Sequence, residues 1–560
     1  MKSSYPLSSA LRPPSSAIRR PFPAFLLSSF VFGLCLLLLP ACTKRETAVE
    51  AGIRTHTLLV GNGSEPNSLD PHVAKSTTDS GILTALFEGL TALDEQTTRA
   101  VPAVAERWEI SPDGLVYTFH LRSSARWSNG DPVTAADFAF TFQRILNPKF
   151  GAHYSNMLHP IKNAEAFNTG KIRDFSAVGV AAIDEHTLRL TLERPTPYLP
   201  ALATHMTWLP LHRPTLEKYR AVDTRTAPWT RPGALVGNGP FTLTEWRANV
   251  HIVVQKNPHY WDAVRNRLQR IVFLPTESTA VEERNFRAGQ THVTAGLPTT
   301  KIAFYREHEP ARLRLDPSST ALFLRFNVTR APFNNLKVRR ALALAIDREG
   351  LVRAVFADSR RPAAHLTPPA FSGYTTRART PTDFVAARRL LAEAGFPAGR
   401  GLPAVEILVL SSNPEMARLA EVIQETWRHE LGVASMVATK EEGTFWQCQQ
   451  LLDYSTAWGG WAPDFVDPAT FLEMFVEKGG NNWTGWANPD YDRLISEAAR
   501  TTDPNRRFEF FQQAEALLLE EAPIAPLYFD TRTYLIHPAV KGWVPAPLLA
   551  RRYQYVWLEK

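Results

Sequence analysis

The sequence has few cysteines and lacks the motifs that mark the common hydrolases and nucleotide-binding enzymes. Three of its 560 residues are cysteine. It contains no G-x-S-x-G elbow, no H-E-x-x-H pair and no phosphate-binding loop of the form G-x-x-x-x-G-K-S/T. Its histidines are scattered, and His308 with Glu309 has no second histidine at the spacing of metal ligands. These absences argue against an enzyme of those classes and against a dedicated metal site.

A strong basic surplus is also missing once the first residues are set aside. The formal charge of the whole chain is +7, but residues 1–41 contain four basic residues and no acidic one, so the remainder carries +3. No basic stripe or base-stacking motif accompanies this mild charge. The composition therefore argues against nucleic acid as a partner.

The first 41 residues are organised like an export signal. A basic, acid-free segment (Met1–Pro23) precedes an apolar run (Ala24–Leu39) that is too short for a confident membrane-spanning helix. The sequence LPAC that ends at Cys42 resembles a bacterial lipobox, where the signal is cut before the cysteine and the thiol is lipidated. We therefore expect a lipoprotein signal over residues 1–41 and an exported, membrane-anchored protein in the periplasm or at the cell surface. The alternative is an uncleaved anchor with an incidental cysteine.

Disulfides cannot stabilise the mature chain. Cys35 lies in the signal and Cys42 is the expected lipid site, which leaves Cys448 alone. Residues 42–56 are polar and predict a tether. The rest is too long for one core, so we expect two or three domains that are held together by large buried cores.

Hydrophobic periodicity changes character near Ala321. Upstream, alternation and turn signals predict strands, at 115–122, 188–192, 241–246 and 250–255. Thr134 is typical of a helix N-cap, and Phe138, Phe142 and Ile145 would form the apolar face of that helix. Downstream, helices alternate with strands, which favours an α/β lobe. The strands expected there are 321–327, 405–410 and 433–437, and the helices are 335–346, 382–394 and 415–431.

The stretch from Trp458 to Leu472, WGGWAPDFVDPATFL, combines two indoles, a glycine pair and two acids. Glycines allow close backbone approach, indoles offer flat contact area, and a carboxylate among them can meet a cation. This composition suits a ligand site. A loop broken by proline and glycine, with tryptophan in the core and acids in solvent, explains it equally well from the local sequence.

Several blocks along the chain occur together in one known family. The most recognisable is AERWEISPDGLVYTFHLRSSARWSNGDPVTAADFAFTF, residues 105–142. The others are SLDPH (68–72), LFEGL (86–90), VGNGPFTLTEW (236–246), KNPHYWDA (256–263), FNNLKVRRALALAIDRE (333–349), ARRLLAEAGF (387–396) and NNWTGWANPDYDRLI (481–495). In this order they resemble the family 5 solute-binding proteins, whose best-known members are the oligopeptide-binding proteins of ABC importers.

The resemblance implies an α/β, two-lobed, periplasmic-binding-protein-like fold of class II, with a ligand cleft between the lobes at a two-segment hinge. The core of lobe I would comprise residues 57–80, 203–315 and 528–560. An extra subdomain inserted in lobe I would span 81–202, and lobe II would span 316–527.

The resemblance also implies a site and partners. In oligopeptide-binding members, an Asp that follows Trp-x-x pairs with the α-ammonium of the peptide, and Asp464 matches that position after Trp461. Trp461 and the Gly460 backbone would line the same subsite, and Glu65 matches an acid that faces the cleft. An Arg that often precedes the tryptophan is missing from Ser455–Trp458, so the carboxylate of the ligand would be absent, solvated or met by a base elsewhere. Trp458 would instead stack on an apolar or sugar-like surface of the ligand. The partners would be an oligopeptide and an ABC permease with its ATPase; the protein would be a monomer without a cofactor.

Three alternatives stay open. The ligand of the same receptor class would be a nickel chelate, haem, an opine or an oligosaccharide rather than a peptide. The receptor would signal a bound peptide to a sensor protein instead of importing it. A secreted hydrolase would use Asp464 and Asp467 as acid and base, although their spacing is not diagnostic of catalysis.

Overall fold

The computed structural model describes residues 45–369, 371–477, 479–546, 548 and 551–560. The expected signal peptide and the expected lipid site at Cys42 lie outside these residues. The chain divides into a unit Met1–Glu46 and a unit Thr47–Lys560, and the second unit is described below. Within the described ranges, none of the helices has the length and apolar character needed to cross a membrane.

The expected tether is wrong over its second half, because a helix, α2 (Ala48–Thr55), forms there. The backbone N–H of Thr47 donates to Glu50, and the N–H of Glu50 donates back to the Thr47 hydroxyl at 3.1 Å, a capping box that polar composition conceals. Val49 is buried, and its N–H donates to the carbonyl of Gly289 at 2.9 Å. The helix is therefore docked on the folded unit rather than free.

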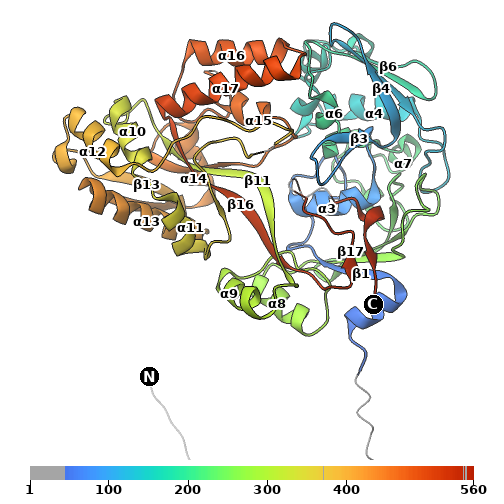
Figure 1. Ribbon diagram of the computed structural model, residues 1–560. Helices are drawn as coiled ribbons and strands as arrows, with labels where there is room; N and C mark the ends of the chain where they lie inside the picture. Colours follow the sequence, from blue (N-terminus) through green and yellow to red (C-terminus); the bar gives the residue numbers. More distant parts are fainter. Residues whose placement is uncertain (1–44, 370, 478, 547, 549–550) are drawn as a thin grey trace, which may run out of the picture. The chain divides into compact units, whose positions relative to one another are not determined.

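The first sheet pairs a strand near the start of the unit with three strands from residues 241–274. Its strand order is β1-β10-β9-β8, with β1 and β10 parallel and the other pairs antiparallel. These strands are β1 (Thr57–Gly61), β8 (Phe241–Arg247), β9 (His251–Lys256) and β10 (Arg270–Leu274). The short hairpin of β17 (Val540–Lys541) and β18 (Trp557–Leu558) lies beside β1 (Figure 1). The helices in this part are α3 (Thr77–Leu86), α7 (Arg213–Lys218), α8 (Thr279–Arg287) and α9 (Thr299–His308).

A second four-stranded sheet, β4-β5-β7-β6, is entirely antiparallel and lies within residues 105–191. Its strands are β4 (Ala105–Ile110), β5 (Val116–Leu121), β6 (Val180–Ala182) and β7 (Thr187–Thr191). Helix α4 (Ala135–Leu146) starts where Thr134 predicted, and its expected apolar face is fully buried. The backbone N–H and the hydroxyl of Thr134 donate to Asp137 at 2.8 and 2.9 Å. The remaining elements here are β2 (Thr91–Leu93), β3 (Ala100–Pro102), α5 (Ala164–Asn168) and α6 (Leu199–Leu202).

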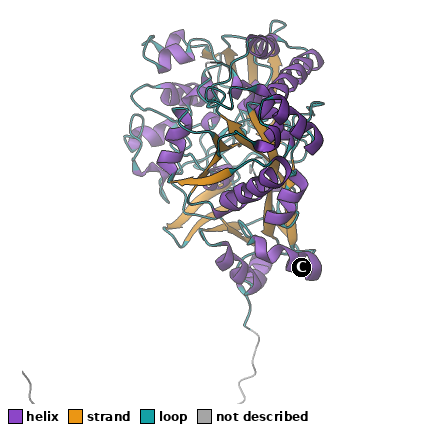
Figure 2. Cartoon of the chain, turned by 90° about the vertical axis from the view of Figure 1, so that its left-hand side faces the viewer, coloured by secondary structure: helices purple, strands orange, loops and turns teal. Residues whose placement is uncertain are grey.

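The third sheet has six strands in the order β12-β16-β11-β15-β13-β14. They are β11 (Leu313–Phe326), β12 (Arg361–Pro362), β13 (Val405–Leu410), β14 (Ser435–Lys440), β15 (Thr456–Trp461) and β16 (Ile524–Leu535). The three helices expected after residue 330 are confirmed as α10, α12 and α13, and helices lie outside the strands of this region (Figure 2). The helices are α10 (Leu336–Leu344), α11 (Arg348–Phe356), α12 (Phe384–Glu393), α13 (Pro414–Leu431), α14 (Glu442–Gln450), α15 (Ala469–Leu472), α16 (Pro489–Arg500) and α17 (Pro504–Glu521).

Strands β11 and β16 connect two hydrophobic cores. They pair antiparallel from Leu313–Leu535 to Arg325–Ile524, with register shifts along the way. On β16, Ala525, Leu527 and Tyr528 belong to the core under α10, α11 and α13, whereas Ile524, Phe529 and Tyr534 belong to the core that includes the first sheets. Two long strands thus form a continuous link between the two packed regions.

Candidate ligand-binding site

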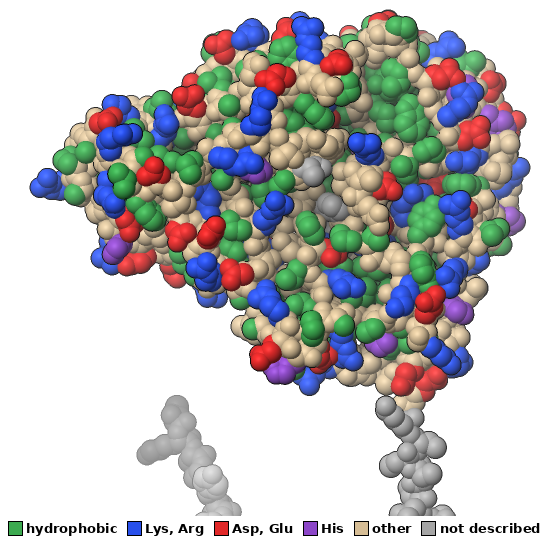
Figure 3. Space-filling model, viewed as in Figure 1, with side chains coloured by type: hydrophobic (Ala, Val, Ile, Leu, Met, Phe, Trp, Pro, Cys, Tyr) green, Lys and Arg blue, Asp and Glu red, His purple; other side chains and the backbone are tan. Residues whose placement is uncertain are grey.

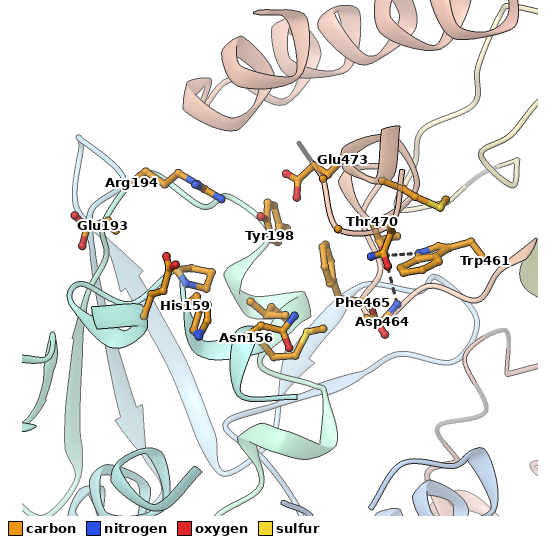
Figure 4. A pocket seen from close by; sticks show the side chains of 18 residues that line it. Asn156, His159, Glu193, Arg194, Tyr198, Trp461, Asp464, Phe465, Thr470 and Glu473 are labelled. Atoms are coloured by element: carbon orange, nitrogen blue, oxygen red, sulfur yellow. Dashed lines mark hydrogen bonds between the residues drawn. The ribbon is translucent and has the colours of Figure 1, made fainter. Parts of the chain in front are cut away.

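A cavity of about 410 Å³ lies between residues 156–202 and residues 461–481. Figure 4 shows side chains from these two segments facing each other. One wall carries Asn156, His159, Arg194 and Tyr198, and the opposite wall carries Trp461, Asp464, Phe465, Thr470 and Glu473. The two walls come from segments that lie far apart in the sequence, so a molecule bound here would contact both segments.

The Trp458–Leu472 stretch begins as a strand rather than a loop. Residues Thr456–Trp461 form β15, between β11 and β13. Its two glycines permit close strand packing: a Cβ at Gly459 would lie 2.6 Å from the Phe323 ring, and one at Gly460 would lie 2.7 Å from Leu322. The surface that the glycines approach is therefore β11. Gly460 is not among the residues that line the cavity.

Strand alternation separates the two indoles, because residues three apart in a strand point to opposite faces. Trp458 is 2% exposed and packs in the core near Tyr528, with ring centroids 6.2 Å apart. It does not line the cavity, so the expected stacking of Trp458 on the ligand does not fit this structure. Trp461 does line the cavity.

A single hydroxyl organises the loop after β15. The indole N–H of Trp461 donates to Thr470 Oγ1 at 3.2 Å, and the backbone N–H of Asp464 lies 3.4 Å from the same oxygen. These contacts hold the Trp461 ring and the Asp464 backbone in one arrangement beside the cavity (Figure 4). The spacing Trp-x-x-Asp thus places both side chains in one subsite.

The carboxylate of Asp464 has no ion pair and no hydrogen bond with any residue in the described ranges. Burial alone raises the pKa of Asp464 to about 6. Removing a carboxylate from water disfavours its ionised form unless a cation or hydrogen-bond donor compensates. The cavity therefore presents an acid whose charge is best satisfied by a cationic ligand group.

Asp467 is occupied within the protein. Its two oxygens accept hydrogen bonds from Arg507 Nη1 and Nη2 at 2.7 and 2.6 Å, and both side chains are buried. Bidentate pairs of this kind fix geometry and neutralise both charges. Of the two acids in the stretch, only Asp464 is available to a ligand, which also removes the geometric basis for the acid–base pair of a hydrolase.

Glu65 is not brought to this cavity. Its carboxylate accepts the indole N–H of Trp246 at 2.7 Å and the backbone N–H of Asn249 at 2.9 Å. It thereby anchors the segment after β1 to the β8–β9 turn. The expectation that Glu65 is an acid facing the ligand cleft stays a prediction, and these contacts occupy both of its carboxylate oxygens.

Among the cavity residues that sequence reasoning missed, Tyr198, Glu473 and Arg194 matter most for the chemistry of the site. Tyr198 stacks on Phe465 across the cavity, with centroids 4.8 Å apart. Burial, as the largest cause, raises the pKa of Glu473 to about 7, and Arg194 lies close enough to lower it in part. Glu473 stands only nine residues after Asp464, which was a usable signal, whereas nothing in the sequence around Tyr198 and Arg194 marks them.

Other kinds of site find little support. The described residues contain no group of three or more His, Cys, Asp or Glu side chains arranged to hold a metal ion. Acidic and basic side chains intermingle over the face shown in Figure 3. Local charges inside a cavity, rather than a surface field of one sign, are therefore the features available for recognition.

Comparison with known proteins assigns the chain to a family. The sequence model of the bacterial extracellular solute-binding proteins, family 5, matches residues 99–483. The chain belongs to this family. A relative, the periplasmic oligopeptide-binding protein OppA of Salmonella typhimurium, is 32% identical over 527 residues, which cover 91% of this chain and 94% of OppA. Family membership confirms the resemblance drawn from the ordered sequence blocks.

Two further family relatives bear on fold and ligand. The solved structure of the murein tripeptide-binding protein MppA, in its unliganded open form, aligns with a TM-score of 0.79 at 29% identity, covering 90% of this chain and 97% of MppA. The two-lobed α/β fold is thus confirmed. The probable deoxycholate-binding periplasmic protein YgiS of Escherichia coli is 32% identical over 490 residues, covering 86% of this chain and 89% of YgiS. Relatives with this similarity therefore carry names that refer to different ligands.

Proposed function

We propose that this protein is the oligopeptide-binding component of an ABC importer, and that Asp464 binds the α-ammonium of the peptide. The observation that carries the proposal is the partly buried carboxylate of Asp464, which has no partner among the described residues and faces a cavity lined by two segments far apart in the sequence. An ammonium that leaves water on binding needs such a partner. The names of relatives such as OppA support the peptide as ligand.

The Asp464 carboxylate favours a peptide over deoxycholate as the ligand. Deoxycholate, the ligand in the name of YgiS, is an anion and carries no amine, so it would leave Asp464 unpaired or repel it. A peptide with a free amino terminus supplies the missing cation. The aromatic and thioether side chains of Trp461, Phe465 and Met474 would contact the adjoining backbone and side chains.

We infer that ligand binding closes the lobes about β11 and β16. The proposed lobe I is residues 57–80, 203–315 and 528–560, with 81–202 inserted, and lobe II is 316–527. In support, both long strands contribute side chains to both cores, Phe323 and Leu324 on β11 and Tyr528 and Phe529 on β16. A peptide that touches both walls of the cavity would bind the closed form more tightly and shift the population towards it.

Export, lipidation at Cys42, a monomeric state and delivery of peptide to a membrane permease with its ATPase complete the proposal. The names of the relatives as periplasmic proteins support export. The LPAC sequence supports the lipid anchor. Radiolabelled palmitate incorporation in the full chain, compared with Cys42→Ala, tests the anchor separately from ligand binding.

The decisive experiment compares peptides with free and acetylated amino termini. Asp464→Asn keeps the size of the side chain and removes its charge, so free-amine peptides should lose at least about tenfold in affinity, since breaking a buried pair costs about 3–5 kcal/mol. Acetylated peptides should bind both proteins equally weakly. Mass spectrometry of ligand that co-purifies with wild type identifies the natural ligand. An equal loss for both peptide types removes Asp464 from the role of anchor.

A further inference from the structure

A second cavity, of about 280 Å³, lies at the edge of the first sheet. Its walls come from the turn after β1, the first turns of α3, the end of β16 and the C-terminal segment. It shares no lining residue with the Asp464 cavity. The lining residues that matter here are Asn62, Thr77, Thr78, Arg532, Trp543 and Arg551.

Arg532 is the cation of this cavity that has no protein partner. Its guanidinium makes no hydrogen bond and no ion pair with the described residues, and it sits 5.4 Å from the ring centroid of Tyr534. Loss of hydration, the largest cause, lowers the pKa of Arg532. A partly buried guanidinium with five donors and no acceptor is costly unless a ligand supplies one.

Arg551 provides a second unsatisfied donor. The side chain is 3% exposed, its Nη1 donates to Glu95 at 3.2 Å and to the Val544 carbonyl at 2.6 Å, and its Nη2 is buried without a partner. The ring of Trp543 lies 4.1 Å from the guanidinium carbon. These contacts fix the orientation of the Arg551 guanidinium and leave its Nη2 donor without a hydrogen-bond partner among the described residues.

The acids around the cavity are already engaged. Asp316 accepts the hydroxyl of Tyr534, and Glu95 accepts Arg551 and the backbone N–H of Arg552. Asp79, near the start of α3, accepts four backbone N–H groups of residues 67–76. None of these acids forms an ion pair with Arg532, so the cavity as a whole favours an anion. A planar guanidinium fork matches a carboxylate in particular.

The strand register relates this cavity to Asp464. Trp461 on β15, Ala321 on β11 and Phe529 on β16 lie in one row across the sheet. Both β15 and β16 run antiparallel to β11, so both leave the row in the same direction. Asp464 and Arg532 each follow three residues later. Across two strand spacings the backbones of Trp461 and Phe529 are about 10 Å apart.

We propose that Arg532, assisted by Arg551, binds the carboxylate of the peptide whose ammonium binds Asp464. This inference rests on the proposed function. It supplies the cation that the Ser455–Trp458 segment lacks. A peptide that reached both cavities would have to span at least this row of about 10 Å, which at about 3.3 Å per extended residue requires about three residues or more.

The test compares alanine peptides of three to five residues that end in a free acid or in an amide, all with free amino termini. Wild type should bind the acid at least about tenfold more tightly. In Arg532→Gln the preference should vanish while affinity for the amide stays within about threefold. Arg314→Gln, which removes an exposed arginine from β11, should behave like wild type. An acid preference that survives in Arg532→Gln, or is absent from wild type, overturns the proposal.

Two further measurements keep the outcomes separate. If Arg532→Gln melts early in circular dichroism, Arg532→Lys takes its place and should show an intermediate acid preference; an unchanged preference there again contradicts the proposal. N-Acetylglycine carries a carboxylate and no ammonium. If no peptide binds wild type, the proposed function fails; N-acetylglycine then decides the inference by perturbing indole NMR signals in wild type but not in Arg532→Gln. No perturbation in wild type, or perturbation of both proteins, overturns it, and competition by acetate shows whether any small carboxylate suffices.

Discussion

The rings of Tyr198 and Phe465 stack face to face, with 4.8 Å between centroids and 7° between planes. Tyr198 belongs to the segment expected as the inserted subdomain and Phe465 to the segment expected as lobe II, so this contact spans the cavity. A stacked pair contributes about 0.5–1.5 kcal/mol beyond its buried area. It is therefore an apolar contact between regions that are proposed to move relative to one another.

Tyr198→Ala should weaken peptide binding by about threefold to tenfold, because the lining loses a ring and the two walls lose their stack. Free-amine and acetylated peptides should lose affinity by the same factor, in contrast to Asp464→Asn. Isothermal titration measures both. A loss confined to free-amine peptides would assign Tyr198 to amine recognition instead.

Peptide affinity should depend on pH through Asp464. Its pKa of about 6 in the ligand-free protein means that protonation competes with the ligand ammonium. Affinity should be highest near pH 7 and fall by up to about tenfold per unit below about pH 5, since binding requires the ionised carboxylate. It should fall again towards pH 8, where the α-ammonium of the peptide, with a pKa of about 7.7–8.0, loses its proton. Dissociation constants measured from about pH 4.5 to pH 8 test this sign.

Three variants isolate the responsible group. Asp464→Asn should remove the fall in affinity at low pH. Glu473→Gln should keep the fall in affinity at low pH, although Glu473, whose pKa is raised to about 7, titrates in the same cavity. His159 also lines it, and His159→Gln is the matching control. If the pH dependence of peptide affinity disappears only in the Glu473 or His159 variant, that residue rather than Asp464 is responsible for it.

Breaking the Asp467–Arg507 pair should destabilise the fold. Arg507→Met leaves the buried Asp467 carboxylate without its cation and with only the backbone N–H of Ala469 as a donor, at a cost of about 3–5 kcal/mol in the free energy of unfolding. Urea denaturation measures this cost. The double variant Asp467→Asn with Arg507→Met should recover part of it, because no unpaired charge remains. Equal stability of wild type and Arg507→Met would show that the pair is dispensable.

The two indoles of β15 should respond differently to the same substitution. Trp458→Phe removes buried area and should lower stability by about 1–3 kcal/mol while leaving peptide affinity unchanged. Trp461→Phe removes the hydrogen bond to Thr470 beside Asp464, so it should weaken binding more than folding. Thermal melting and titration of both variants decide this. A loss of peptide affinity in Trp458→Phe would show that Trp458 contributes to the binding site after all.

Much of the lobe containing the third sheet could be predicted from the sequence. Strand 405–410 is reproduced by β13, and the helix expected at 415–431 begins one residue earlier and ends before Gly432 at φ +66°. Strand β11 was expected only from Ala321, because Asp316 and Pro317 interrupt the apolar pattern of its first half. That half is stabilised by pairing with β16, more than 200 residues away, which no local pattern reveals.

The site was only partly predictable for the same reason. Trp461 and Asp464 lie in one short motif, so their proximity follows from the chain itself. Trp458 fits the composition of a ligand site equally well, yet strand alternation turns it to the opposite face. The proposed role of Arg532 could be recognised only from the tertiary structure. Among the described residues, its guanidinium is unpaired because Asp316 and Glu95 form hydrogen bonds with other residues.

Helix α2 changes the mechanics of the proposed anchor. Because the chain is docked from Thr47 onward, only Cys42–Glu46 would link the lipid to the folded unit, and five residues span at most about 18 Å. This short linker would keep the lobe that carries β1 close to the bilayer. On closure, the other lobe would then move towards the lobe that carries β1, which would stay at a nearly constant height above the membrane.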